Sequence, residues 1–255
     1  MHRFKDYINQ KETGNLVVTK KEEKYLKSLK RLEVFPFPEG VLTTDNYFML
    51  QNYKTGGFLV LDTDDRNQNY ENAFAVTTNP LINFACPRSL FRIEKCEKKN
   101  NSTDPQIINY GDKFYFTTHS EIFNEILYLS STLSSPFSHS KFSNNQEVLV
   151  ISQKSFNSVW IIEHTDITLR YSLEGKPVSI NDSFIIRHSA TGRLLASDYI
   201  DYFNDYGHEY EVCCNNFVTQ NKYQTLIAEK EGKLKIDTKT RVEKDENIWR
   251  VIDQI

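Results

Sequence analysis

The side chains best suited by type to hold a metal ion lie between positions 62 and 69. Asp62, Asp64, Asp65, Asn67 and Asn69 offer oxygen ligands of the kind that calcium prefers. No register of this segment also supplies the glycine at position six and the glutamate at position twelve of a calcium-binding loop. We therefore interpret the segment as a polar hairpin tip.

Other catalytic and metal-binding patterns are weak. The six histidines are scattered without a helical metal-ligand spacing: His2, His119, His139, His164, His188 and His208. A fold that brings three of these histidines together to bind a metal ion stays an open alternative. The adjacent Cys213 and Cys214 predict one inward and one outward strand residue, not a redox site. Phosphate-loop, nucleophile-elbow and zinc-helix motifs are missing from the sequence. We expect a protein that is not an enzyme and uses no cofactor or metal.

Composition favours a globular β protein. The 255 residues include 39% hydrophobic and 13% aromatic side chains, with 17 Phe and 14 Tyr. Aromatic and β-branched residues favour strands. The net charge of −3 argues against nucleic acid as the main ligand. No apolar run approaches the roughly 20 residues of a membrane span, so we expect no membrane partner. The first thirty residues lack a signal-peptide core, which together with the cysteine pattern predicts a reducing cytosolic compartment.

The amino-terminal 40 residues differ from the rest, and we predict a basic helical arm over residues 1–40. Phe4, Tyr7 and Ile8 lie at helical spacing, and a second amphipathic stretch follows around Tyr25 and Leu29. We expect this arm to dock on an acidic partner through its cations, with apolar residues adding affinity. The candidate contacts are Arg3, Lys5, Lys20, Lys21, Lys24, Lys27, Lys30 and Arg31. A simply solvated helical face remains the alternative.

A repeat of 68 residues organises the remainder. Short apolar strands precede and follow turn positions at Gly56, Asn124 and Gly192, which are spaced by 68. Glycine and asparagine tolerate a left-handed backbone better than other residues do. Each repeat also closes on an apolar strand with an aromatic residue, at Phe91, Trp160 and Trp249. The spacing therefore predicts three equivalent units.

Each unit has room for four strands, and twelve strands in three repeats are typical of a β-trefoil. We predict an all-β protein with a single trefoil domain over residues 41–255 and repeats at about 45–95, 111–165 and 181–255. The third repeat is longer, with further strand-like segments expected at 223–228 and 233–236. The repeat-closing triplets lack the glutamine of the Gln-x-Trp motif of ricin-type lectins, which disfavours a lectin. A cytosolic module for a small sugar or phosphoinositide stays open, as does a hydrolase with carboxylates in a loop-lined cleft.

The sequence also resembles a known family. Lys5-Asp6-Tyr7 and Thr13 to Val18 are similar to the amino terminus of the cilia- and flagella-associated protein 161 family. Leu127 to Ser131 is similar to the family's second repeat. Further matches follow in the family's order along the chain: Leu169, Tyr171, Glu174-Gly175, Pro177-Val178, Asn181, His188 to Ala196, and Arg241 to Asn247 before Trp249. The segment from Phe217 to Lys239 is longer than the family pattern.

The resemblance implies a MIR-like β-trefoil that is a structural microtubule inner protein. Such a protein lies in the lumen of the A-tubule of doublet microtubules in the ciliary axoneme. It would bind the α/β-tubulin lattice and other microtubule inner proteins and stabilise the doublets for motility. The family supplies no catalytic residues to carry over. The asparagine- and lysine-rich composition is typical of an AT-rich genome such as that of a ciliate.

Overall fold

Apolar residues at alternating positions form the strands of this protein in a computed structural model. The model describes residues 16–66, 72–96, 106–218, 222–233 and 241–253. One sheet contains β1 (Met49–Asn52), β2 (Phe58–Arg66), β3 (Phe74–Asn79), β4 (Phe91–Lys95), β5 (Lys113–Thr118), β6 (Tyr128–Ser131), β7 (Gln146–Ile151), β8 (Val159–His164), β9 (Phe184–His188), β10 (Leu195–Asn204), β11 (Gly207–Cys214) and β14 (Ile248–Ile252). The main expectation, an all-β fold, is thereby confirmed.

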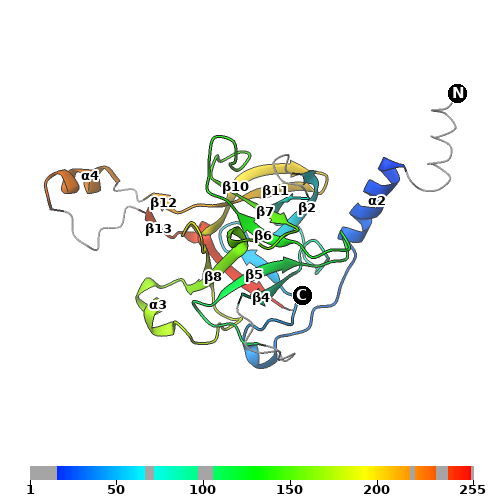
Figure 1. Ribbon diagram of the computed structural model, residues 1–255, viewed down its shortest axis with the longest axis horizontal. Helices are drawn as coiled ribbons and strands as arrows, with labels where there is room; N and C mark the ends of the chain where they lie inside the picture. Colours follow the sequence, from blue (N-terminus) through cyan, green and yellow to red (C-terminus); the bar gives the residue numbers. More distant parts are fainter. Residues whose placement is uncertain (1–15, 67–71, 97–105, 219–221, 234–240, 254–255) are drawn as a thin grey trace.

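The remaining elements lie outside that sheet. The helices are α2 (Val17–Ser28), α3 (Ile167–Leu173) and α4 (Lys222–Lys230), and short 3-10 turns occupy Pro38–Gly40, Phe156–Ser158 and Asp245–Asn247. A separate small sheet consists of β12 (Phe217–Val218) and β13 (Arg241–Val242). Figure 1 places the barrel-like sheet centrally, with α2 and α4 leaving it on opposite sides.

Six of the strands close into a ring of antiparallel pairs. β1 pairs with β14, β14 with β9, β9 with β8, β8 with β5, and β5 with β4. Reciprocal backbone hydrogen bonds of 2.9 Å between Phe48 and Phe91 then join β4 to the residue before β1. Ring closure leaves these six strands with neighbours on both edges, which removes the exposed edges that open sheets must protect.

Three hairpins cover one end of this ring. They are β2–β3, β6–β7 and β10–β11, and each is antiparallel. The second strands of the three hairpins also pair with one another, because β3 contacts β7, β7 contacts β11, and β11 contacts β3. The hairpins are therefore held together as a unit and do not project separately into solvent.

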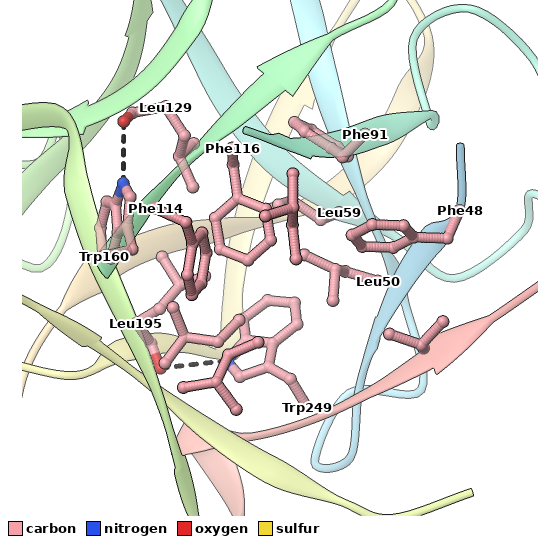
Figure 2. Packing of buried hydrophobic residues seen from close by; sticks show 14 of the residues in the cluster. Phe48, Leu50, Leu59, Phe91, Phe114, Phe116, Leu129, Trp160, Leu195 and Trp249 are labelled. Atoms are coloured by element: carbon pink, nitrogen blue, oxygen red, sulfur yellow. Dashed lines mark hydrogen bonds between the residues drawn. The ribbon is translucent and has the colours of Figure 1, made fainter. Parts of the chain in front are cut away.

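Inward-pointing side chains of ring and hairpins share a single main core (Figure 2). Phe91, Trp160 and Trp249 are each fully buried in it. The indole N–H of Trp160 donates to the carbonyl of Leu129 at 2.8 Å, and that of Trp249 donates to the carbonyl of Leu195 at 3.0 Å. Both tryptophans thus bury a large apolar ring and satisfy their one polar group.

The three turn positions share an unusual backbone conformation. Gly56, Asn124 and Gly192 have φ angles of 67°, 56° and 69°. This left-handed region is costly for most L-residues and mild for glycine and asparagine. The residue types at the repeated positions therefore match the backbone that each turn adopts.

Two local expectations were wrong. Residues 223–228 form part of helix α4 instead of a strand, because Tyr223, Leu226 and Ile227 lie at helical spacing and do not alternate. The second helix of the arm ends at Ser28, and the chain then continues extended, so that Leu32 and Val34 pack on a smaller core cluster with Met49. The expected strand over 233–236 falls largely outside the described residues, as does the expected helix around Phe4 and Ile8.

Candidate partner-binding surface

Helix α2 is fixed to the barrel through an aromatic stack. The ring of Tyr25 lies 4.9 Å from that of Tyr206, with an interplanar angle of 20°. The Tyr206 hydroxyl lies within hydrogen-bond distance of the Ser28 hydroxyl, at 2.8 Å, and of the Thr63 hydroxyl, at 2.6 Å. Ser28 is fully buried, so the last turn of α2 is part of the folded domain.

A buried ion pair lies beneath this stack. The guanidinium carbon of Arg88 is 3.4 Å from the centre of the Tyr206 ring. Arg88 donates two hydrogen bonds to the Glu209 carboxylate, at 2.9 and 3.2 Å, and one to the carbonyl of Leu61. Both side chains are fully buried. Such a bidentate pair fixes the orientation of the guanidinium plane on which Tyr206 rests.

The Glu209 carboxylate has further donors that keep it ionised. Asn79 and Asn204 each donate an amide N–H at 2.7 Å, and the Thr77 hydroxyl also donates. Burial by itself would raise the pKa of Glu209, but the charge of Arg88 and these hydrogen bonds hold the pKa below its ordinary value. The network is therefore charged at neutral pH, and it reaches α2 through the ring of Tyr206.

Two of the predicted contact lysines bind the protein's own barrel. Lys21 forms ion pairs with Asp64 and Asp205, and these carboxylates together raise its pKa. Lys24 donates to the carbonyl of Thr63, and its ammonium group lies 4.2 Å from the centre of the Phe123 ring. These cations seat α2 on the hairpin end of the barrel.

The other predicted cations divide into three groups. Lys30 pairs with Glu121 at 2.6 Å, and the Arg31 guanidinium lies 5.0 Å from the centre of the Phe84 ring. Lys20 and Lys27 are exposed, and none of the ion pairs between described residues includes either of them. Arg3 and Lys5 lie outside the described residues. Lys20 and Lys27 are thus the exposed cations of the described arm that none of these contacts engages.

Sequence reasoning did not single out the residues that seat the helix. Tyr206, Arg88 and Glu209 carry no local motif. Tyr206 and Glu209 are near neighbours in the sequence, but Arg88 lies 121 residues before Glu209. The fold brings them together where β11 pairs with β3. A lone arginine and a glutamate inside a strand gave no signal that could have linked them.

A second element projects from the barrel. The chain leaves the barrel after β11 through β12 and returns through β13 before β14, and α4 lies between β12 and β13 at the far end of the molecule from α2 (Figure 1). Tyr223 is 77% exposed, and Leu226 and Ile227 are 43% and 41% exposed. Neither core cluster includes a residue of α4.

His188, Cys213 and Cys214 are buried inside the fold. His188 is fully buried, with ring nitrogens within hydrogen-bond distance of the Asn157 carbonyl and the Thr191 hydroxyl, and burial lowers its pKa. Cys214 lies in the main core, and Cys213, on the opposite side of the strand, is also buried. Burial raises the pKa of the Cys213 thiol to about 12, so it is a thiol at neutral pH. Within the described ranges no three His, Cys, Asp or Glu side chains are grouped to hold a metal ion.

One small cavity could take a polar ligand. It has a volume of about 210 Å³ and lies beside the β6–β7 hairpin, with Ser130, Thr132 and Asn157 among its lining residues. Ser130 already donates to the carbonyl of Asn157 at 3.0 Å. Among the described residues no helix has the length and apolar character needed to cross a bilayer.

Comparison with known proteins identifies the family. The family model of the cilia- and flagella-associated protein 161-like domain matches residues 65–227. The chain belongs to this family. The zebrafish (Danio rerio) cilia- and flagella-associated protein 161 is 26% identical over 236 residues, which is 86% of this chain and 77% of that protein. Its bovine (Bos taurus) counterpart is 27% identical over 58% of this chain and 40% of its own length.

The fold has counterparts among solved structures. The SDF2-like protein from Arabidopsis thaliana aligns with a TM-score of 0.57 at 18% identity, over 84% of this chain and 95% of that one. A Caenorhabditis elegans protein of unknown function aligns with a TM-score of 0.56 at 16% identity, over 84% and 97%. At these identities, the likeness to the two solved structures shows a shared fold alone. The family match over residues 65–227 and the zebrafish relative confirm the family resemblance that the sequence shows.

Proposed function

We propose that this chain is a structural microtubule inner protein of the ciliary axoneme. In this proposal it binds the tubulin lattice and neighbouring inner proteins inside the A-tubule of doublet microtubules, and it stabilises the doublets for motility. The observation that carries the proposal is the family match over residues 65–227, together with relatives that are named for cilia and flagella. The protein acts by binding and not by catalysis.

The architecture is well suited to such a role. A closed ring of strands with a capped end is rigid, and rigid scaffolds position loops for contact with several partners. Several weak contacts along a repeating lattice add up through their high effective concentration. The buried Arg88–Glu209 pair and the Tyr206 stack hold α2 in one orientation, so the outer side of α2 is presented in a defined direction.

We also assign the barrel to the β-trefoil class, with the domain over 41–255 and repeats at about 45–95, 111–165 and 181–255. Support comes from the six-stranded ring, the three hairpins and the mutual pairing of β3, β7 and β11. The equivalent turns at Gly56, Asn124 and Gly192 fit the same assignment. In this proposal residues 1–40 form the arm that precedes the domain.

Retention in isolated axonemes tests the location. A tagged copy is expressed in a ciliated cell, and axonemes are stripped of membrane and washed in high salt. Electrostatic binding on the outer surface is screened at high salt, whereas a protein enclosed in the lumen stays with the doublets. Loss into the soluble fraction would contradict the proposal, and it would favour a small-ligand module that uses the cavity beside β6–β7.

The arm has its own test. We expect Lys20→Glu with Lys27→Glu to weaken axonemal retention, because these exposed lysines are free of ion pairs with described residues and face outward. Circular dichroism checks that the variant is folded. Lys141 is an exposed lysine in the loop 132–145, and Lys141→Gln serves as a charge control away from the arm. Unchanged retention of the double variant would remove the described lysines of the arm from the proposed contact.

A further inference from the structure

Helix α4 has the features of a docking element and lacks those of a structural one. It is nine residues long and lies away from the barrel, and neither core cluster includes it (Figure 1). Isolated helices shorter than about 12–15 residues are marginal in water, because most helix stability in proteins comes from packing of an apolar side. A helix in this position is expected to gain its packing from outside the barrel.

The side chains of α4 define which side would be packed. Leu226, Ile227 and Lys230 lie three, four and seven residues after Tyr223, so the four residues share one side of the helix. Three of them are apolar or aromatic and the fourth is a cation at the carboxyl end. All four are exposed. We name this set the α4 stripe.

The charge of the projecting segment indicates the character of its partner. By sequence, residues 217–242 contain six basic and three acidic side chains, whereas the whole chain carries a net charge of −3. Of the basic residues, Lys222, Lys230, Lys233 and Arg241 lie in described segments, and Lys235 and Lys239 fall outside them. Cations on the helix that carries an apolar stripe are complementary to an acidic surface that contains an apolar groove.

A protein surface fits this stripe better than a lipid surface does. Helices that lie in membrane interfaces carry tryptophan, phenylalanine or leucine along one side and lysine or arginine along the other. Helix α4 presents three apolar side chains in under three turns. Binding to a membrane interface strengthens with the apolar area that is buried, so this short stripe would bind a membrane weakly, whereas a shaped protein groove needs only a short stripe.

We propose that the α4 stripe docks in an acidic, apolar groove on the tubulin lattice and that docking orders α4. This inference rests on the proposed function and adds a contact that is separate from α2. The two elements leave the barrel on opposite sides, so the lattice would hold the domain at two separated points (Figure 1). The basic residues would speed and orient association, and the α4 stripe would supply the buried contact.

Copolymerisation with purified tubulin tests the contact, because it gives the full chain access to the lumen during assembly. We expect Leu226→Asp to reduce the amount that sediments with microtubules roughly tenfold, since a charge would enter the apolar contact. Leu169→Asp is the matched control, because Leu169 is also 43% exposed on a short helix, α3. We expect hydrogen exchange of residues 222–230 to slow when the full chain is bound.

The outcomes separate this inference from the proposed function. If the wild-type chain sediments with microtubules and Leu226→Asp does so equally, the α4 contact is overturned and the proposed function stands. If the wild-type chain fails to sediment, the tubulin contact of the proposed function fails as well. Equal binding of the wild-type chain to phosphatidylserine vesicles, or self-association that Leu226→Asp abolishes, would overturn a tubulin groove in favour of lipid or of a second copy.

Discussion

At the scale of single residues, the most consequential side chain is Glu209. It is fully buried, pairs with Arg88 and accepts hydrogen bonds from three further side chains. Removing one member of a buried ion pair leaves the other charge uncompensated, which typically costs about 3–5 kcal/mol. We therefore expect Glu209→Gln to lower the free energy of unfolding by about that amount at pH 7, measured by urea denaturation.

The pH dependence of this effect has a definite sign. Because the pKa of Glu209 is lower in the folded state than its ordinary value of 4.5, its contribution to stability is present above that value. It is lost as the pH falls towards the lowered pKa, when the folded carboxylate becomes protonated. The difference between wild type and Glu209→Gln should therefore shrink as the pH falls below about 4.5. An equal difference at all pH values, or the same effect from Glu125→Gln at an exposed glutamate, would contradict this account.

Residues of this kind mark the limit of sequence reasoning. Gly56, Asn124 and Gly192 could be selected in advance, because a left-handed turn restricts the residue type. Arg88 and Glu209 could not, because neither restricts its local segment and their pairing depends on strands from different parts of the chain. The same applies to Lys21, whose partners Asp64 and Asp205 become neighbours only after the hairpins assemble.

At the scale of elements, periodicity identified the strands well and the arm incompletely. The alternating apolar strands were predicted because each has a buried side with period two. The stretch at 223–228 was assigned as a strand because it contains β-favouring residues, although its apolar positions have helical spacing. The extended segment with Leu32 and Val34 falls inside the predicted helical arm over residues 1–40, because leucines at helical spacing precede it.

The seating of α2 gives a prediction at this scale. Tyr25→Ala removes one ring of the stack on Tyr206, and aromatic pairs contribute about 0.5–1.5 kcal/mol beyond their buried area. We expect faster hydrogen exchange of residues 17–28 with unchanged exchange in the barrel strands. The control is Leu26→Ala, because Leu26 is 62% exposed on the same helix. Equal acceleration by both variants would mean that helix propensity and not the stack sets the stability of α2.

At the scale of the whole molecule, the 68-residue spacing predicts one domain of repeated units, but it does not determine how the first and last strands meet. β14 pairs with both β1 and β9, so the last described strand joins the first proposed repeat to the third. The three hairpins are likewise joined through β3, β7 and β11. Each proposed repeat thus lacks a complete core of its own, and the three should be stable only together.

This interdependence predicts a single cooperative unfolding transition. The chain contains two tryptophans, Trp160 and Trp249, which are fully buried in different proposed repeats. Trp160→Phe and Trp249→Phe each leave one tryptophan as the fluorescent reporter. Each variant also loses one indole hydrogen bond, to the carbonyl of Leu129 in the first and of Leu195 in the second. Within each variant we expect the urea midpoint from fluorescence to coincide with that from far-ultraviolet circular dichroism, as two-state unfolding requires. A fluorescence midpoint below the circular-dichroism midpoint in either variant would mean that one repeat unfolds separately, and the single-domain assignment over 41–255 would then be wrong.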